Sequence, residues 1–332
     1  MPERGHGPEA EGRRRGDPVN AEPRLAFCFP GQGSQAVGMG RAFHEVSSAA
    51  RAVFEEASDA LGMDVAKLCF EGPEDALQLT ANTQPAVLTV SVAAARVLAE
   101  RGVRPSMVGG HSLGEYSALV VAGALAFRDA VRVVRQRGEF MQEAVPVGTG
   151  AMAAILGVDL AVVEEVCREA ARGEVVDVAN INAPGQIVVA GNRGAVERAV
   201  ALAAERGGLR SVLLPVSAPF HSRLMAPAAE RLAAALQEVP KAAPVLPVVR
   251  NVDAELTTRT EEIGPSLVRQ VTAPVRWTDC VARLAKEGCG TFLEVGPGRV
   301  LTGLLKRIDG TVTGLAIEDP VGLDKAAAAL GA

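Results

Sequence analysis

Aromatic residues make up only 3 % of this chain of 332 residues, so its core has to be built mainly from aliphatic side chains. Histidine is also scarce, and its four copies leave few candidates for a reaction that needs an imidazole. Basic residues are in the minority, because 34 Lys and Arg face 39 Asp and Glu. A nucleic-acid-binding protein usually carries a basic domain or stripe, so we expect no nucleic-acid partner.

Paired cysteines and membrane-length apolar runs are missing as well. The five cysteines form no C-x-x-C pair, which argues against a zinc ribbon or a disulfide framework and favours a reducing, cytoplasmic location. No uncharged apolar run approaches the roughly 18 residues of a membrane span, so we expect no membrane contact. Residues 1–23, which include His6, are rich in charge, glycine and proline and are predicted to form a disordered N-terminal extension.

The order of predicted elements favours an α/β fold with an inserted small domain. Between 147 and 215 the pattern predicts βαββαβ, the order of a ferredoxin-like unit. The flanking segments, 24–146 and 216–320, alternate apolar strands with helices and are predicted to form one α/β-hydrolase-like domain. In the large domain, strands are expected at 25–29, 106–110, 245–249 and 291–295, and helices at 82–99, 115–124 and 127–144. In the insert, strands are expected at 152–156, 175–182, 186–190 and 210–216, and helices at 159–171 and 192–206.

The segment G-H-S-L-G at 110–114 matches the nucleophile-elbow pattern G-x-S-x-G. A strand is predicted before it and a helix after it, as the pattern requires. A sharp turn between the two would expose the Oγ of Ser112 beside the N–H groups and positive end of a helix. The alternative is a glycine-rich turn without chemistry, but the surrounding elements favour Ser112 as a nucleophile.

A serine nucleophile needs a base, and His221 is the only histidine downstream of Ser112. We expect His111, next to the serine, to form a wall of the pocket, and His44, in an amphipathic helical region, to be structural. No acidic residue carries a clear triad signature. Asp253 and Glu294 are possible by position, and a Ser–His dyad oriented by a main-chain carbonyl is equally consistent.

Arg137 is a charged residue on the apolar face of its predicted helix. It shares a spacing of three and four residues with Ala130, Val134 and Met141, so it belongs to the apolar stripe. A buried guanidinium without a partner is costly, so Arg137 should meet an anion or reach solvent. The sequence leaves three readings: an internal salt bridge, a side chain extended to solvent, or a bidentate clamp for a substrate carboxylate.

At this point the chain resembles the malonyl-CoA:acyl carrier protein transacylase family, to which the acyltransferase domains of polyketide synthases are related. The similar motifs span residues 25 to about 308. They are FPGQGSQ (29–35), TQPA (83–86), GHSLGEYSALV (110–120), RG-x-FMQ (137–142), GTGAMAAILG (148–157), NAPGQIVVAG (182–191), PVSAPFHSRLM (215–225), NVD (251–253), LVRQ (267–270) and EVGPG (294–298).

The resemblance implies a fold of the type described above and a set of site residues. Ser112 would be the nucleophile and His221 the base. The main-chain N–H groups of Gln32 and Leu113 would form the oxyanion hole. Arg137 would bind the malonyl carboxylate, in agreement with its position on the helix.

Further residues receive roles from the same resemblance. The main-chain carbonyl of Gln270 would orient the histidine, which favours the dyad. Asn182 would line the pocket together with His111, and Phe220 would narrow the space beside the malonyl C2. The implied substrate is malonyl-CoA and the implied partner is holo acyl carrier protein, with no cofactor and no metal.

The implied reaction is transfer of malonyl to the phosphopantetheine thiol of the carrier through a malonyl-serine, in fatty acid or polyketide synthesis. The first alternative is a serine esterase or thioesterase, which shares the elbow and the histidine but does not need Arg137. A second is a non-catalytic assembly subunit, against which the presence of Ser112, His221 and Arg137 argues. The carrier is expected to be acidic, so docking needs a local basic patch, for which Lys306 and Arg307 are candidates.

Overall fold

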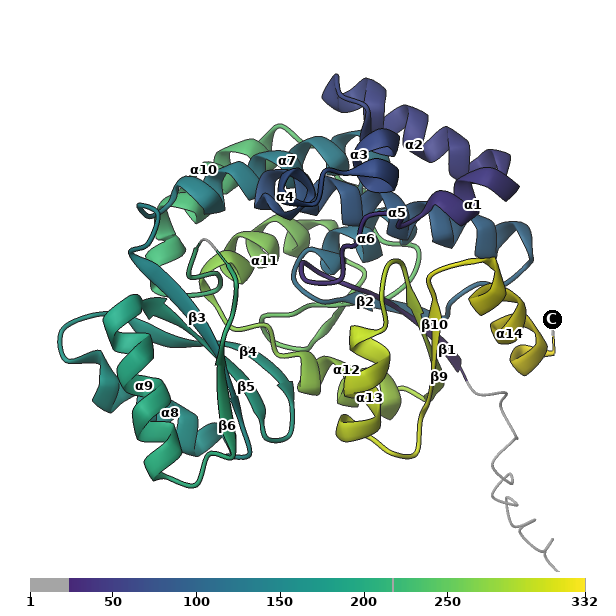
Figure 1. The fold of residues 1–332 in the computed structure, drawn as a ribbon. Helices are drawn as coiled ribbons and strands as arrows, with labels where there is room; N and C mark the ends of the chain where they lie inside the picture. The colour runs from purple at the N-terminus through teal and green to yellow at the C-terminus, as the bar shows by residue number, and fades with distance from the viewer. Residues whose placement is uncertain (1–23, 217, 332) are drawn as a thin grey trace, which may run out of the picture.

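The computed structural model describes residues 24–216 and 218–331. The predicted disordered extension, residues 1–23 with His6, lies outside them. A six-stranded sheet with the order β10-β9-β1-β2-β7-β8 forms the centre of the larger part of the molecule (Figure 1). Its strands are β1 (Arg24–Phe29), β2 (Met107–Gly110), β7 (Val248–Val249), β8 (Leu256–Thr257), β9 (Cys289–Val295) and β10 (Thr313–Ile317). All neighbours pair in parallel except β7 and β8, and the predicted α/β class is confirmed.

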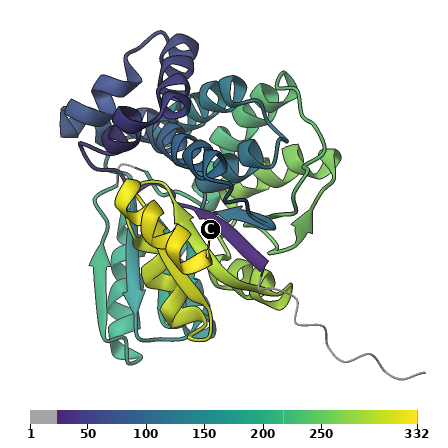
Figure 2. The same ribbon diagram turned by 90° about the vertical axis from the view of Figure 1, so that its right-hand side faces the viewer.

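Strand β1 is buried on both faces of this sheet, because successive side chains of a strand point to opposite sides. Phe27 and Phe29 join the core with the N-terminal helices, whereas Ala26 and Cys28 join the core around Trp277. Figures 1 and 2 show the helices on the two sides of the sheet. The first side holds α1 (Arg41–Val46), α2 (Ser48–Leu61), α3 (Val65–Glu71), α4 (Glu74–Gln78), α5 (Thr80–Glu100), α6 (Gly114–Val121), α7 (Phe127–Glu143), α10 (Ala226–Gln237) and α11 (Thr260–Thr272); the second holds α12 (Trp277–Lys286) and α13 (Val300–Ile308).

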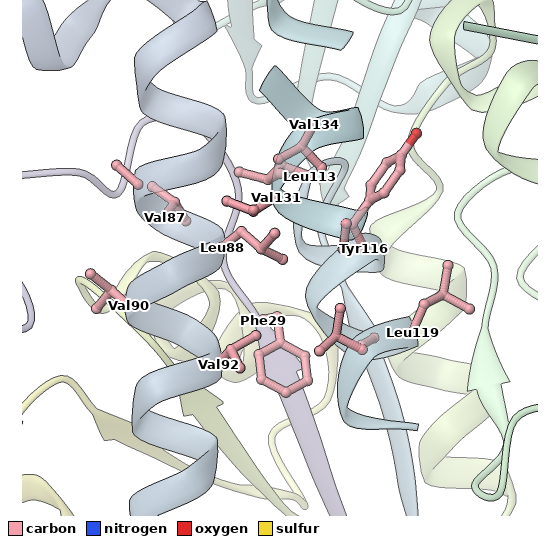
Figure 3. Close-up of a cluster of buried hydrophobic side chains, with 14 of the residues drawn as sticks. Phe29, Val87, Leu88, Val90, Val92, Leu113, Tyr116, Leu119, Val131 and Val134 are labelled. Carbon is pink, nitrogen blue, oxygen red and sulfur yellow. The ribbon is translucent and has the colours of Figure 1, made fainter. Parts of the chain in front are cut away.

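Helix α5 packs against α6 and α7 through aliphatic side chains, as the shortage of aromatics requires (Figure 3). This helix begins earlier than predicted. Asn82 and Thr83, at the predicted start, lie inside it; the Thr83 hydroxyl donates to the carbonyls of Leu77 and Leu79, and Pro85 lies within the helix. The packing fixes α7, and with it Arg137, beside the end of β2.

A second, antiparallel sheet of order β4-β5-β3-β6 lies beside the first (Figure 1). It is built in the predicted order βαββαβ, and its own core lies between the sheet and two helices. The elements are β3 (Gly150–Leu156), α8 (Leu160–Ala171), β4 (Val176–Ala183), β5 (Gln186–Asn192), α9 (Arg193–Glu205) and β6 (Arg210–Leu213). The Val275 main chain, between α11 and α12, is bonded to Ala179 and Ile181 of β4, so the small sheet is tied to the large part through this connection.

Two strands, predicted at 210–216 and 245–249, are shorter in the structure, and a proline in each segment explains the difference. Strand β6 stops at Leu213, before Pro215, and β7 contains only the two residues after Pro247. Proline has no N–H to donate to a neighbouring strand, so an apolar run that contains one need not pair along its whole length.

The division into 24–146 with 216–320, and an insert at 147–215, stays a proposal. It is supported by the separate core of the small sheet. Helix α14 (Pro320–Leu330) packs against β10, so we would extend the large part to residue 330. Within the described ranges, no helix combines the length and the apolar content needed to cross a membrane.

Candidate active site

Ser112 occupies the sharp turn between β2 and α6. Its φ is 52°, in the left-handed region that non-glycine residues rarely adopt. The glycines on either side make this turn possible. A Cβ on Gly110 would lie 2.0 Å from the main chain of Gly114, and a Cβ on Gly114 would lie 2.0 Å from the carbonyl oxygen of Phe29. The hydroxyl is thereby held at the start of a helix, as the elbow pattern predicts.

His221 lies next to this hydroxyl, with Nε2 2.8 Å from Ser112 Oγ. Its Nδ1 lies 2.7 Å from the main-chain carbonyl of Gln270, which requires the proton on Nδ1 and leaves Nε2 free to accept one. Burial and the nearby charge of Arg137 lower the pKa of His221 to about 3. The imidazole is therefore neutral at pH 7 and has the tautomer that a general base needs.

Neither acidic candidate for a triad reaches the histidine. Asp253 is bonded to Arg250 and Arg269, on the surface. Glu294 is buried and accepts hydrogen bonds from the main-chain N–H groups of Leu301 and Thr302 at the start of α13. The geometry corresponds to the dyad, with a carbonyl as the third group.

Arg137 points into the site and is 1 % exposed. Its Nη2 lies 3.1 Å from Ser112 Oγ and 3.0 Å from Gln270 Oε1, and Nη1 lies 2.8 Å from Gln84 Oε1. These partners are all neutral, and no carboxylate of the described residues forms an ion pair with Arg137. Burial lowers its pKa from the usual value. In the part of the chain that the structure describes, Arg137 therefore neither forms an internal salt bridge nor extends to solvent.

A cavity of about 110 Å³ opens beside Ser112. His111, Phe220, Gln32 and Leu113 contribute to its wall, and among the described residues neither the main-chain N–H of Gln32 nor that of Leu113 has a hydrogen-bond acceptor. Both are thus available as donors. The lining consists of Gln32, Gln84, His111, Ser112, Leu113, Arg137, Met141, Met152, Asn180, Leu214, Val216, Phe220 and His221.

Two further residues of the predicted site, Asn182 and Gln270, have side chains behind this wall. The Asn182 Oδ1 atom accepts a hydrogen bond from His111 Nε2 at 2.8 Å, and Asn182 does not line the cavity. The Gln270 side chain is fully buried and contacts Arg137. Both hold residues of the wall in place. Of the docking candidates, Arg307 is bonded to the turn between β4 and β5 through the Pro184 carbonyl.

Sequence reasoning assigned no role to several polar residues that complete the site. Gln84 holds Arg137 from α5, and Asn251 accepts the Ser112 N–H at 2.7 Å while donating to the Gly110 carbonyl at 2.8 Å. Glu115 is buried one turn after the serine. The available signal for Gln84 was an amide directly before a mainly apolar run of the same helix. Within the part of the chain that the structure describes, no group of three or more His, Cys, Asp or Glu residues could hold a metal ion.

Comparison with known proteins agrees with this geometry. The sequence model of one protein family, described as the acyl transferase domain, matches residues 26–315 of this chain. A malonyl CoA-acyl carrier protein transacylase from Escherichia coli (strain K12) is 51 % identical over 298 residues, which are 90 % of this chain and 96 % of that protein. A crystal structure of an acyl-carrier-protein S-malonyltransferase from Burkholderia pseudomallei has a TM-score of 0.90 at 50 % identity and covers 93 % of this chain and 100 % of its own.

A further solved structure contains a type II polyketide synthase acyl-carrier protein in complex with its malonyl-transacylase. It has a TM-score of 0.90 at 47 % identity and covers 91 % of this chain and 98 % of its own. Matches over so much of the chain, on a fold with a serine at an elbow, define an acyltransferase. About half of the aligned residues are identical to those of malonyl CoA-acyl carrier protein transacylases. The chain therefore belongs to the malonyl-CoA:acyl carrier protein transacylase family.

Proposed function

We propose that this protein transfers the malonyl group from malonyl-CoA to the phosphopantetheine thiol of acyl carrier protein, through a malonyl ester of Ser112. The observation that carries the proposal is Arg137, a buried cation 3.1 Å from Ser112 Oγ without a carboxylate partner among the described residues. An acyl group with a terminal carboxylate would supply the missing anion in a bidentate pair. An esterase of simple acyl groups would have no use for this cation.

The acylation half-reaction uses the dyad. His221 Nε2 takes the proton of Ser112 as Oγ attacks the thioester carbonyl. The negative charge on the former carbonyl oxygen is met by the N–H groups of Gln32 and Leu113. The C–S bond then breaks, and the CoA sulfur leaves with the proton that His221 holds.

The second half-reaction runs these steps in reverse with the carrier thiol. His221 accepts the thiol proton as the sulfur attacks the malonyl ester, and it returns that proton to Ser112 Oγ when the ester bond breaks. A transferase has to favour this thiol over water. The small cavity and the Arg137 clamp support that preference, because they hold the acyl group in one place and leave little room for solvent. Ping-pong kinetics follow from the covalent intermediate.

Malonyl selectivity is assigned to Phe220 as part of the same proposal. Its side chain is in the cavity wall directly before the base, where it would contact a substituent on the malonyl C2. The proposed location is the cytoplasm, supported by five cysteines that are all buried and unpaired, as suits a reducing compartment.

Intact-mass measurement tests the function. Incubation with malonyl-CoA should add one malonyl group to the protein, and addition of holo acyl carrier protein should move that mass to the carrier. Ser112→Ala should show no adduct, whereas Ser106→Ala, ahead of β2, should be labelled like the wild type. Release of malonate as fast as transfer to the carrier would favour the thioesterase, and no adduct on the wild type would favour a non-catalytic subunit.

A further inference from the structure

Glu115 is a buried carboxylate to which the reaction described above gives no task. It lies in the first turn of α6, is 2 % exposed and forms no ion pair with the described residues. Burial raises its pKa to about 7. Removing a carboxylate from water costs free energy unless hydrogen bonds replace the lost solvation, so the contacts of Glu115 indicate what it does.

One of these contacts fixes the orientation of the Gln270 side chain. Glu115 Oε2 accepts from Gln270 Nε2 at 2.7 Å. The same Nε2 lies 3.0 Å from the Ser112 carbonyl and 3.2 Å from Asn251 Oδ1. An amide donates from one end and accepts at the other, so three acceptors on one side allow a single orientation. The oxygen of Gln270 then faces Arg137, whose Nη2 lies 3.0 Å away.

The second contact leads to the nucleophile. Glu115 Oε2 also accepts the main-chain N–H of Asn251 at 3.0 Å. Asn251 in turn accepts from the main-chain N–H of Ser112, the residue with the strained φ, and donates to the carbonyl of Gly110 at the end of β2. One carboxylate oxygen therefore connects the elbow that carries the nucleophile with the amide that aims the guanidinium.

We propose that Glu115 is a positioning residue for malonyl selection: by accepting hydrogen bonds from Gln270 and Asn251, it keeps Arg137 aimed at the acyl group on Ser112. This inference rests on the proposed function, because it concerns the clamp for the malonyl carboxylate. It predicts that the acceptor oxygen matters and the negative charge does not. A glutamine at this position keeps an acceptor of the same reach, whereas a leucine fills similar space without one.

The test measures acyl-enzyme formation in a single turnover from malonyl-CoA and from acetyl-CoA, which has no carboxylate for Arg137. Glu115→Leu should lower the malonyl-to-acetyl rate ratio about tenfold, the effect of one lost hydrogen bond to a charged group. Glu115→Gln should keep the ratio within about threefold of the wild type. The matched control is Glu294→Gln, which alters the buried carboxylate bonded to the start of α13, outside the lining of the cavity, and should not change the ratio.

An unchanged ratio in folded Glu115→Leu overturns the proposal, and so does a ratio in Glu115→Gln as low as in Glu115→Leu. If Glu115→Leu does not fold, the same rate ratio is measured for Gln270→Met. This variant keeps the main-chain carbonyl for His221 and removes only the side-chain amide. Its ratio should fall about tenfold as well, and a retained ratio overturns the proposal. A wild type without a malonyl adduct contradicts the proposed function instead.

Discussion

The guanidinium of Arg137 donates a hydrogen bond from Nη2 to the hydroxyl of Ser112, 3.1 Å away, so the proposed clamp and the proposed nucleophile are in direct contact. The same hydroxyl lies 2.8 Å from Nε2 of His221. Arg137 therefore faces the oxygen to which we propose that the acyl group is attached. Its position also lowers the pKa of the base, because a nearby cation disfavours the imidazolium form.

The first prediction concerns the substrate carboxylate. Arg137→Met keeps the volume of the side chain and removes the charge, so malonyl transfer should fall roughly a hundredfold, as expected for two charge-assisted hydrogen bonds. Acetyl transfer should change far less. Arg135→Met is the control, since Arg135 lies on the same helix and pairs with Glu139 on its outer side. Single-turnover labelling from both donors measures the effect, and equal losses would make Arg137 a structural residue.

This residue also shows what the sequence can and cannot indicate. Helical spacing alone placed Arg137 on the buried face, and counting histidines left His221 as the base. The partners of Arg137 could not be found in that way. Gln84 and Gln270 lie 53 and 133 residues from it, and only the packing of α5, α7 and α11 brings them together. Spacing along the chain reports on one element at a time, whereas this site is formed between elements.

The strand ends illustrate the same limit on a smaller scale. The apolar run at 210–216 is predicted as one strand, but the strand ends at Leu213, and the Leu214 N–H makes the last main-chain hydrogen bond to β3. Leu214 and Val216 line the cavity instead. Their apolar character is consistent with either place, so hydrophobicity alone could not separate a strand residue from a pocket residue.

The second prediction concerns the pH dependence of acylation. Burial keeps the pKa of His221 at about 3, well below the usual 6.5, so the base stays neutral and competent as the pH falls through 6.5. With the pantetheine thioester of acetate, which has no group titrating near neutrality, acyl-enzyme formation should show no inflection between pH 5 and 7.5. A pH series of single turnovers checks this. A fall centred near 6.5 would mean that His221 titrates like an exposed histidine.

The third prediction follows from the same lowered pKa and concerns stability. Between pH 6.5 and about 3 the unfolded chain protonates His221 and the folded chain does not, so stability falls as the pH falls through this window. At pH 5 this group alone should cost about 2 kcal/mol relative to pH 8. Denaturant unfolding of the wild type and of His221→Asn at both pH values isolates the effect, because the other titrating groups cancel in the difference. Equal losses in the two proteins would contradict it.

The fourth prediction concerns the size of the acyl group. Phe220 is 7 % exposed, and its ring belongs to the cavity wall beside the dyad. Phe220→Ser should remove the contact with a methyl group on C2 and shift selectivity toward methylmalonyl-CoA by about 1–3 kcal/mol, or roughly 10–200-fold. Competition between malonyl-CoA and methylmalonyl-CoA, followed by the mass of the acyl-enzyme, measures the shift directly.

The control for this change is Met152→Leu, which alters another side chain of the wall at nearly constant volume. It should leave the preference for malonyl within about threefold of the wild type, because it opens no space next to the base. If Phe220→Ser lowers both acylation rates by the same factor, the ring supports His221 without selecting the substrate. If Met152→Leu shifts selectivity as far as Phe220→Ser, the limit on C2 substituents depends on the shape of the whole wall and not on the residue before the base.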